Sequence, residues 1–244
     1  MELKDKVIVI TGGATGIGRA AAEVCAARGA QVIVADFNQQ EGAAVAQAIG
    51  GLFAPVNVAD EASVKQLFEQ VGARYGRLDA LITAAGILKG AYVPVEEFPL
   101  DIYRQVVDVN LVGSFLCARS AVPWMKKAGR GVIVLISSIA ATAVSSSVAY
   151  GSSKGGVSSL GITLAGKLAP DNIRVNVVHP GGIKTNMKLS VIAQEAELKG
   201  QSGKQAWASA AAGTELGEPE GVGKILAWLV SDDADYVRGF LHTR

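Results

Sequence analysis

The chain has 244 residues, half of them apolar, and a formal net charge of +1 at pH 7. Without a basic excess or a dense lysine or arginine run, binding to nucleic acid or to an anionic membrane is not expected. The length suits one large domain, and the small share of charged residues, 18%, indicates a surface partly covered in a homo-oligomer.

Short apolar runs alternate with helical patterns along most of the chain. The runs predict strands at 6–11, 31–36, 52–57, 78–83, 131–137, 172–178 and 238–242. The helical patterns lie at 17–29, 39–49, 61–75, 100–127, 149–169 and 220–231. This alternation predicts an α/β fold: a single doubly wound Rossmann-type domain over 1–244, with a mostly parallel seven-stranded sheet and helices on both faces.

The first predicted strand runs directly into the segment Thr11 to Gly18, in which four of eight residues are glycine. Glycine permits a sharp turn and a close approach of the backbone to a diphosphate, and the helix that opens near Gly16 directs its free N–H groups at that anion. Asp36 ends the second strand, where a carboxylate would accept hydrogen bonds from an adenosine ribose. The order of these elements predicts a dinucleotide site.

Ligands of parallel α/β sheets bind beyond the carboxyl ends of the strands. The residues that follow the strands are therefore the expected functional ones: 12–18, Asp36, Asn57, 84–86, Ser138 and 180–185. The segment 186–214 has only weak periodicity. It is either a mobile substrate lid or an ordinary pair of surface helices.

Tyr150 and Lys154 stand four residues apart at the start of a helix that is rich in glycine and serine. Residues at this spacing share one helix face, so the ammonium can lie near the phenol. A nearby cation favours the phenolate and lowers the tyrosine pKa toward the range of a general acid/base.

Taken together, these motifs resemble those of the compact short-chain dehydrogenases/reductases. The resemblance covers essentially the whole chain. It is carried by Thr11 to Gly18, Thr83 to Gly86, Asn110, Ser138, the Tyr150/Lys154 pair and Pro180 to Thr185.

The resemblance implies a role for each matching residue. Tyr150 would exchange a proton with the substrate oxygen while a hydride moves to or from the nicotinamide. Lys154 would lower the Tyr150 pKa and hold the nicotinamide ribose. Ser138 would bind the substrate oxygen, and Asn110 would hold a water that relays protons through Lys154. The residues implied to bind the cofactor are Gly12, Thr15, Gly16, Ile17, Gly18, Asp36, Phe37, Asn57, Val58, Ala84, Ala85, Gly86, Tyr150, Lys154, Pro180, Gly181, Ile183 and Thr185.

The chain departs from the family pattern at four places. Asn57 stands where the family usually has Asp, and Thr83-Ala84 replaces Asn-Asn. Ser138 precedes Tyr150 by twelve residues where thirteen is usual, which leaves Ser137 as an alternative catalytic hydroxyl. The sequence also ends at Arg244, before the usual acidic-glycine tail, so a short last strand and altered oligomer contacts are expected.

The expected cofactor is NAD rather than NADP, because Asp36 would repel a 2′-phosphate. Thr15 and Phe37 occupy the positions where NADP-dependent members carry basic residues, and Arg19 is expected to point away from the ribose. The expected enzyme is an NAD-dependent short-chain alcohol dehydrogenase or ketoreductase. The alternatives are a catalytically silent dinucleotide-binding sensor or scaffold protein, and an epimerase or dehydratase, which usually needs a larger substrate domain.

The substrate is expected to be a small, uncharged, partly apolar alcohol or ketone. This expectation comes from residues of 87–99 and of the predicted lid: Leu88, Tyr92, Val93, Met187, Leu189, Ile192 and Trp207. A homotetramer is expected because helices 100–127 and 149–169 carry many small residues, among them Gly155, Gly156, Ser158, Ser159, Gly161 and Ala165.

A cytoplasmic location is expected from two features. The first apolar run, Val7 to Ile10, is too short for a signal peptide, and Cys25 and Cys117 read as free thiols in a reducing compartment. The uncharged segment 131–153 is rich in serine and its apolar part has only strand length, so no membrane span is expected there. With two distant histidines and two distant cysteines, no metal site is expected.

Overall fold

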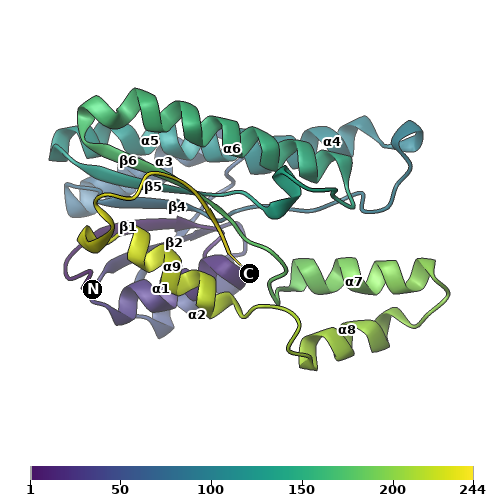
Figure 1. The fold of residues 1–244 in the computed structure, drawn as a ribbon. Helices are drawn as coiled ribbons and strands as arrows, with labels where there is room; N and C mark the ends of the chain where they lie inside the picture. Colours follow the sequence, from purple (N-terminus) through teal and green to yellow (C-terminus); the bar gives the residue numbers. More distant parts are fainter. Residues whose placement is uncertain (1, 244) are drawn as a thin grey trace.

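The computed structural model describes residues 2–243 and contains one seven-stranded sheet, in which all the strands are parallel (Figure 1). The strands are β1 (Val7–Thr11), β2 (Gln31–Asp36), β3 (Leu52–Pro55), β4 (Ala80–Thr83), β5 (Gly131–Ile136), β6 (Ile173–His179) and β7 (Gly239–His242). Their order across the sheet is β3-β2-β1-β4-β5-β6-β7. The doubly wound fold class predicted from the sequence is confirmed, and each strand lies within two residues of its predicted limits.

Helices cover both faces of this sheet. They are α1 (Gly16–Ala27), α2 (Gln39–Ala48), α3 (Glu61–Tyr75), α4 (Leu100–Val107), α5 (Gly113–Ala128), α6 (Val148–Leu168), α7 (Asn186–Leu198), α8 (Gly203–Ala212) and α9 (Pro219–Leu229). Figure 1 shows α3, α5 and α6 on one face and α1, α2 and α9 on the other.

The core divides into two apolar layers because side chains of a strand alternate between the faces of the sheet. Along β1, Val7 and Val9 enter the layer beneath α3, α5 and α6, while Ile8 and Ile10 enter the layer beneath α1, α2 and α9. A strand that is covered on both sides needs an apolar residue at every position. This requirement explains why unbroken apolar runs in the sequence located the strands.

The helix predicted at 100–127 is interrupted, which the sequence pattern did not predict. A π-helical turn, Asp108–Val112, separates α4 from α5 and has Asn110 at its centre. Such turns insert an extra residue and re-aim nearby side chains, often at functional sites. The helical run Leu100–Ala128 is long and apolar enough by composition to cross a membrane, yet in this fold α5 packs against β4 and β5.

The segment between β6 and α9 forms a pair of helices, α7 and α8, that extends beyond the sheet (Figure 1). Its two ends are tied together at the base. The Lys184 amide donates to the Gly217 carbonyl and the Gly217 amide donates to the Gly182 carbonyl, each at 2.8 Å. An ion pair between Lys184 and Glu218 adds to this tie.

Candidate active site

A cleft of about 1180 Å³ lies at the carboxyl ends of the strands, between the sheet and α7. Every residue that the sequence implied for cofactor binding lines this cleft, and so does Ser138. Asn110 does not line it and lies behind the segment that follows β4. Residues as far apart in the sequence as Gly12 and Glu220 therefore share one cavity.

The glycine loop, residues 12–18, needs glycine at two positions because other backbone atoms of the protein lie too close for a Cβ atom. Gly12 has a φ of +68°, and a Cβ there would overlap the backbone of Ala85. A Cβ at Gly18 would overlap the Gly12 carbonyl oxygen. Thr15 precedes α1 but its side chain makes no capping hydrogen bond, so the first amides of the helix are left for another acceptor. A helix start of this kind, facing a large cleft, fits a diphosphate.

The carboxylate of Asp36 is fixed at the far end of the cleft. Its Oδ2 accepts from the Ala14 amide and its Oδ1 from the Asn38 amide, both at 2.9 Å. Each oxygen keeps a second lone pair for a ribose hydroxyl. The Oδ1 atom of Asn57 similarly accepts from the Ala59 amide at 3.1 Å and keeps one lone pair toward the cleft.

Arg19 lies on α1 and lines the cleft. Its expected orientation away from the ribose stays a prediction. Its Nε donates to Glu23 Oε1 at 2.8 Å, one helical turn further along α1. The guanidinium is therefore neutralised by an acid of the same helix, which the i, i+4 spacing in the sequence could have indicated.

Tyr150, Ser138 and Lys154 meet between β5 and α6. Burial raises the pKa of the Tyr150 phenol, and a hydrogen bond with the Ser138 hydroxyl lowers it in part. The Lys154 Nζ lies 5.7 Å from the centre of the Tyr150 ring and donates to the Ile136 carbonyl at 2.7 Å. Its other two N–H groups are left for the cleft, beside Gly86.

Burial also changes the pKa of Lys154, the residue expected to assist Tyr150. Burial lowers the pKa of this ammonium to about 8. A hydrogen bond with Ser138 lowers the pKa of the phenol, and the lowering by Lys154 that the resemblance implied stays a prediction. A buried ammonium with so low a pKa can release a proton near neutrality, which suits a proton carrier.

Asn110 fixes the segment that follows β4. Its Oδ1 accepts from the Ile87 amide at 2.8 Å, and its Nδ2 donates to the Ile87 carbonyl at 3.0 Å and to Ser153 Oγ at 2.9 Å. Both amide N–H groups are thus used to hold the 86–88 segment against α6. The implied water relay through Asn110 stays a prediction, with the second lone pair of Oδ1 available for it.

The two neighbouring serines after β5 have different surroundings. Both line the cleft, but only Ser138 has a hydrogen bond with Tyr150, and its Oγ also accepts from the Ala140 amide at 3.1 Å. The Oγ of Ser137 donates to the Lys154 carbonyl at 2.8 Å and lies 2.9 Å from Ser158 Oγ. Ser138 is accordingly the better placed hydroxyl for a substrate oxygen.

Ser138→Ala is expected to lower kcat/KM by roughly 10²-fold, the usual loss for one donor to a reacting oxygen. Ser137→Ala is expected to keep kcat/KM within a few-fold and instead to lower the free energy of unfolding by about 1–3 kcal/mol, because buried partners lose a hydrogen bond. Steady-state kinetics and denaturant unfolding measure the two effects. A larger kinetic loss in Ser137→Ala would reverse the assignment.

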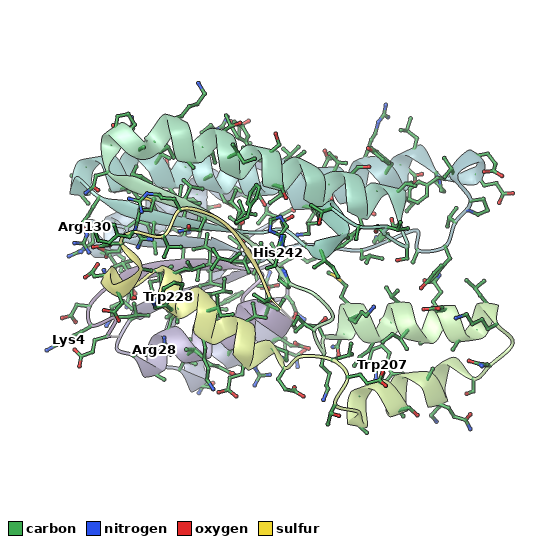
Figure 2. All side chains as sticks on the ribbon, in the orientation of Figure 1. Lys4, Arg28, Arg130, Trp207, Trp228 and His242 are labelled. Atoms are coloured by element: carbon green, nitrogen blue, oxygen red, sulfur yellow. The ribbon has the colours of Figure 1, made fainter. Side chains whose placement is uncertain are left out.

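Few of the side chains expected to choose the substrate reach the cleft. Leu88 and Met187 line it, whereas Tyr92, Val93, Leu189, Ile192 and Trp207 do not. Figure 2 shows Trp207 within the α7–α8 pair. Tyr92 donates from its hydroxyl to Glu195 Oε2 at 3.0 Å, which links the segment after β4 to α7. The cleft also has lining residues that sequence reasoning missed, including Lys89, Gln105, Val144 and Val191.

Comparison with known proteins shows similarity along nearly the whole chain. A family model described as enoyl-(acyl carrier protein) reductase matches residues 12–242. The chain is 35% identical to trans-4-hydroxycyclohexanecarboxylate dehydrogenase of Sinomonas cyclohexanicum, over 96% of this chain and 89% of that protein. It is 36% identical to a 3-oxoacyl-(acyl-carrier-protein) reductase of Thermotoga maritima, over 98% and 96%. The structure of levodione reductase superposes with a TM-score of 0.90 at 29% identity, covering 98% of this chain and 96% of the other.

Proposed function

Because the chain belongs to the short-chain dehydrogenase/reductase family, we propose that it transfers a hydride between NAD(H) and a secondary alcohol or its ketone. The observation that carries this proposal is the meeting of Tyr150, Ser138 and Lys154 at the wall of a cleft that also holds the glycine loop and Asp36. The two relatives named above are a dehydrogenase of a hydroxy compound and a reductase of an oxo compound.

The cleft fits a nicotinamide dinucleotide, which would accept or supply the hydride. The uncapped start of α1 and the loop at Gly16 would hold the diphosphate. Asp36 would accept hydrogen bonds from the adenosine ribose hydroxyls, and Lys154 would donate its free N–H groups to the nicotinamide ribose. Ile183 and Thr185, at the start of α7, would hold the carboxamide.

Proton transfer is assigned to the residues of β5 and α6. Ser138 would donate to the substrate oxygen and hold it against the Tyr150 hydroxyl. During oxidation, the Tyr150 phenolate would take the hydroxyl proton of the alcohol, and during reduction the phenol would return it. Lys154, whose pKa is about 8, would then exchange protons with solvent. The α7–α8 pair would exclude bulk water from this end of the cleft.

A panel of secondary alcohols, polyols, hydroxy acids and sterols, incubated with NAD⁺ and followed by NADH absorbance, tests this function. Turnover of at least one class is expected. Tight NADH binding without turnover of any substrate in either direction would instead favour the catalytically silent sensor or scaffold.

The rate of alcohol oxidation is expected to rise with pH. Burial raises the pKa of Tyr150, so the phenolate needed for oxidation is scarce at neutral pH and its fraction grows as pH increases. The kcat/KM for oxidation should therefore climb from pH 7 toward pH 10, while that for ketone reduction should fall. Ser138→Ala removes an interaction that lowers the Tyr150 pKa, so the rise should move to higher pH. A flat oxidation profile under conditions where hydride transfer limits the rate would contradict this assignment.

A homotetramer is proposed on exposed apolar side chains of the helical face. Phe115 of α5 and Ile162 of α6 are exposed there. The small residues expected to form the interface face partly inward: Gly161 meets Val177 of β6, and Ser158 contacts Ser137. Light scattering at micromolar concentration is expected to give four times the chain mass of 25.1 kDa. A monomer would contradict the proposal.

A reducing, cytoplasmic location is also proposed. Cys25 and Cys117 are buried and free, and burial raises the pKa of each thiol to about 12. Neither thiolate forms near neutral pH, so both serve as packing residues without a disulfide.

A further inference from the structure

A second, smaller cavity of about 290 Å³ adjoins the cleft on the substrate side. One wall is the segment 86–91, and the other is a face of α7 that carries Met187, Ser190, Val191 and Gln194. The two cavities share Leu88, Lys89 and Met187 among their lining residues. A substrate whose reacting carbon lies at Tyr150 can therefore extend its body into this side cavity.

Lys89 is the one charged residue among those that line the side cavity, within the described part of the chain. Its Nζ donates to Gln105 Oε1 at 2.8 Å, and no carboxylate of residues 2–243 pairs with it. Gln105 lines the main cleft but not the side cavity, and its side-chain amide N–H groups are not used in this bond. An ammonium with two free N–H groups and a neighbouring amide donor make a binding place for an anion.

The acids of the cleft are placed elsewhere. Glu23, Asp36 and Glu41 lie at its adenosine end, which β1 and β4 separate from β5 and its catalytic residues. Glu218 at the base of the lid pairs with Lys184, and Glu220 pairs with Lys224. Apart from Lys154, the lining cations at the substrate end that make no ion pair within residues 2–243 are thus Lys89 and Lys188. Glu195 of α7, which accepts from Tyr92, lies outside both cavities.

The backbone of Lys89 is held at a fixed position relative to the reacting phenol. Its carbonyl accepts from Ser147 Oγ at 2.7 Å, and the same hydroxyl caps α6 by accepting from the Tyr150 amide at 3.3 Å. On the other side, Asn110 clamps Ile87. The base of the Lys89 side chain is thus preorganised with respect to Tyr150.

We infer that the substrate carries a carboxylate, which binds Lys89 where the main cleft meets the side cavity, with Gln105 beside Lys89 in the main cleft, while the alcohol or ketone carbon meets Tyr150. Leu88, Met187 and Val191 contact the apolar body between the two groups. The apolar residues of these segments predict an uncharged substrate from the sequence. Because Lys89 lines both cavities, we expect a hydroxy or oxo carboxylic acid instead. The inference rests on the proposed function, since it places the reacting carbon at Tyr150.

Binding to the enzyme–NADH complex tests the inference without turnover. NADH binding is measured first by nicotinamide fluorescence. Cyclohexanecarboxylate, benzoate and hexanoate are then titrated by calorimetry, each beside its primary amide. At least one carboxylate is expected to bind roughly tenfold more tightly than its amide, a gain typical of a charge-assisted hydrogen bond that is partly exposed to solvent.

Variants assign the preference to one side chain. Lys89→Met should bring the ratio of amide to carboxylate dissociation constants close to one, and Lys89→Arg should largely keep it. Lys204→Met, which removes an equal charge from an exposed position on α8 outside both cavities, should leave the ratio unchanged.

The outcomes separate this inference from the proposed function. Failure of NADH to bind contradicts the proposed function. NADH binding with no carboxylate preferred over its amide, or with a preference that survives Lys89→Met, overturns the carboxylate site alone.

Discussion

Replacing Tyr150 by phenylalanine is expected to reduce kcat roughly 10²- to 10⁴-fold, while the dissociation constant for NADH changes little. The phenol oxygen is the group that contacts Ser138 at the cleft wall, and the phenylalanine ring keeps the same packing. Single-turnover measurements with NAD⁺ and an alcohol identified by the panel would give the loss in the chemical step directly.

Tyr92→Phe is the matched control. Tyr92 also loses a hydroxyl near the substrate end, where its OH donates to Glu195 rather than lining the cleft. This variant is expected to retain kcat within several-fold. If Tyr150→Phe kept a tenth of the parent activity, or if the two variants lost equally, Tyr150 would not be the general acid/base.

The second large effect is expected in cofactor choice. The parent protein should prefer NAD(H) over NADP(H) by roughly a hundredfold or more in kcat/KM, since about 1.4 kcal/mol corresponds to a factor of ten and a 2′-phosphate would approach the Asp36 carboxylate. Asp36→Ser combined with Phe37→Arg should erode or reverse this preference, because Phe37 is 78% exposed at the rim and offers an unhindered position for a guanidinium.

Arg19 supplies an independent test of the same electrostatics. Glu23→Gln leaves the Arg19 guanidinium without its acidic partner, so NADP(H) use should increase even with Asp36 in place. Matched kinetics with both cofactors measure each variant. Comparable kcat/KM for NAD and NADP in the parent protein would mean that Asp36 does not face the ribose.

The sheet could be predicted from the sequence because its strands are buried on both faces. A short apolar run such as Val132 to Ile136, with a glycine before it and serines after it, indicates a buried strand. The π-helical turn around Asn110 could not be predicted, because it depends on a contact between residues that are distant in the sequence. Its hydrogen-bond partner is the backbone of Ile87, far away in sequence, and local helical periodicity carries no trace of that contact.

The same distinction applies to the site. Asp36 and Ser138 follow strand ends, so topology alone brings them to one cleft. Leu189 of α7 and Trp207 of α8 were expected near the substrate, but their orientation depends on how α7 and α8 pack against each other. Lys89 was overlooked because its proposed role depends on having no acidic partner among residues 2–243, which only the folded arrangement reveals.

The hydrogen bonds at the base of the α7–α8 pair affect how easily the segment between them can be exchanged. Gly182 and Lys184 on one side and Gly217 on the other hold the two ends of the excursion together independently of what lies between them. Exchanging residues 186–214 for an excursion of another length changes the loop-closure free energy only slowly, because that cost grows with the logarithm of loop length. The residues between the two ends can therefore change, and the substrate range with them, while the residues proposed for proton transfer after β5 and on α6 stay fixed.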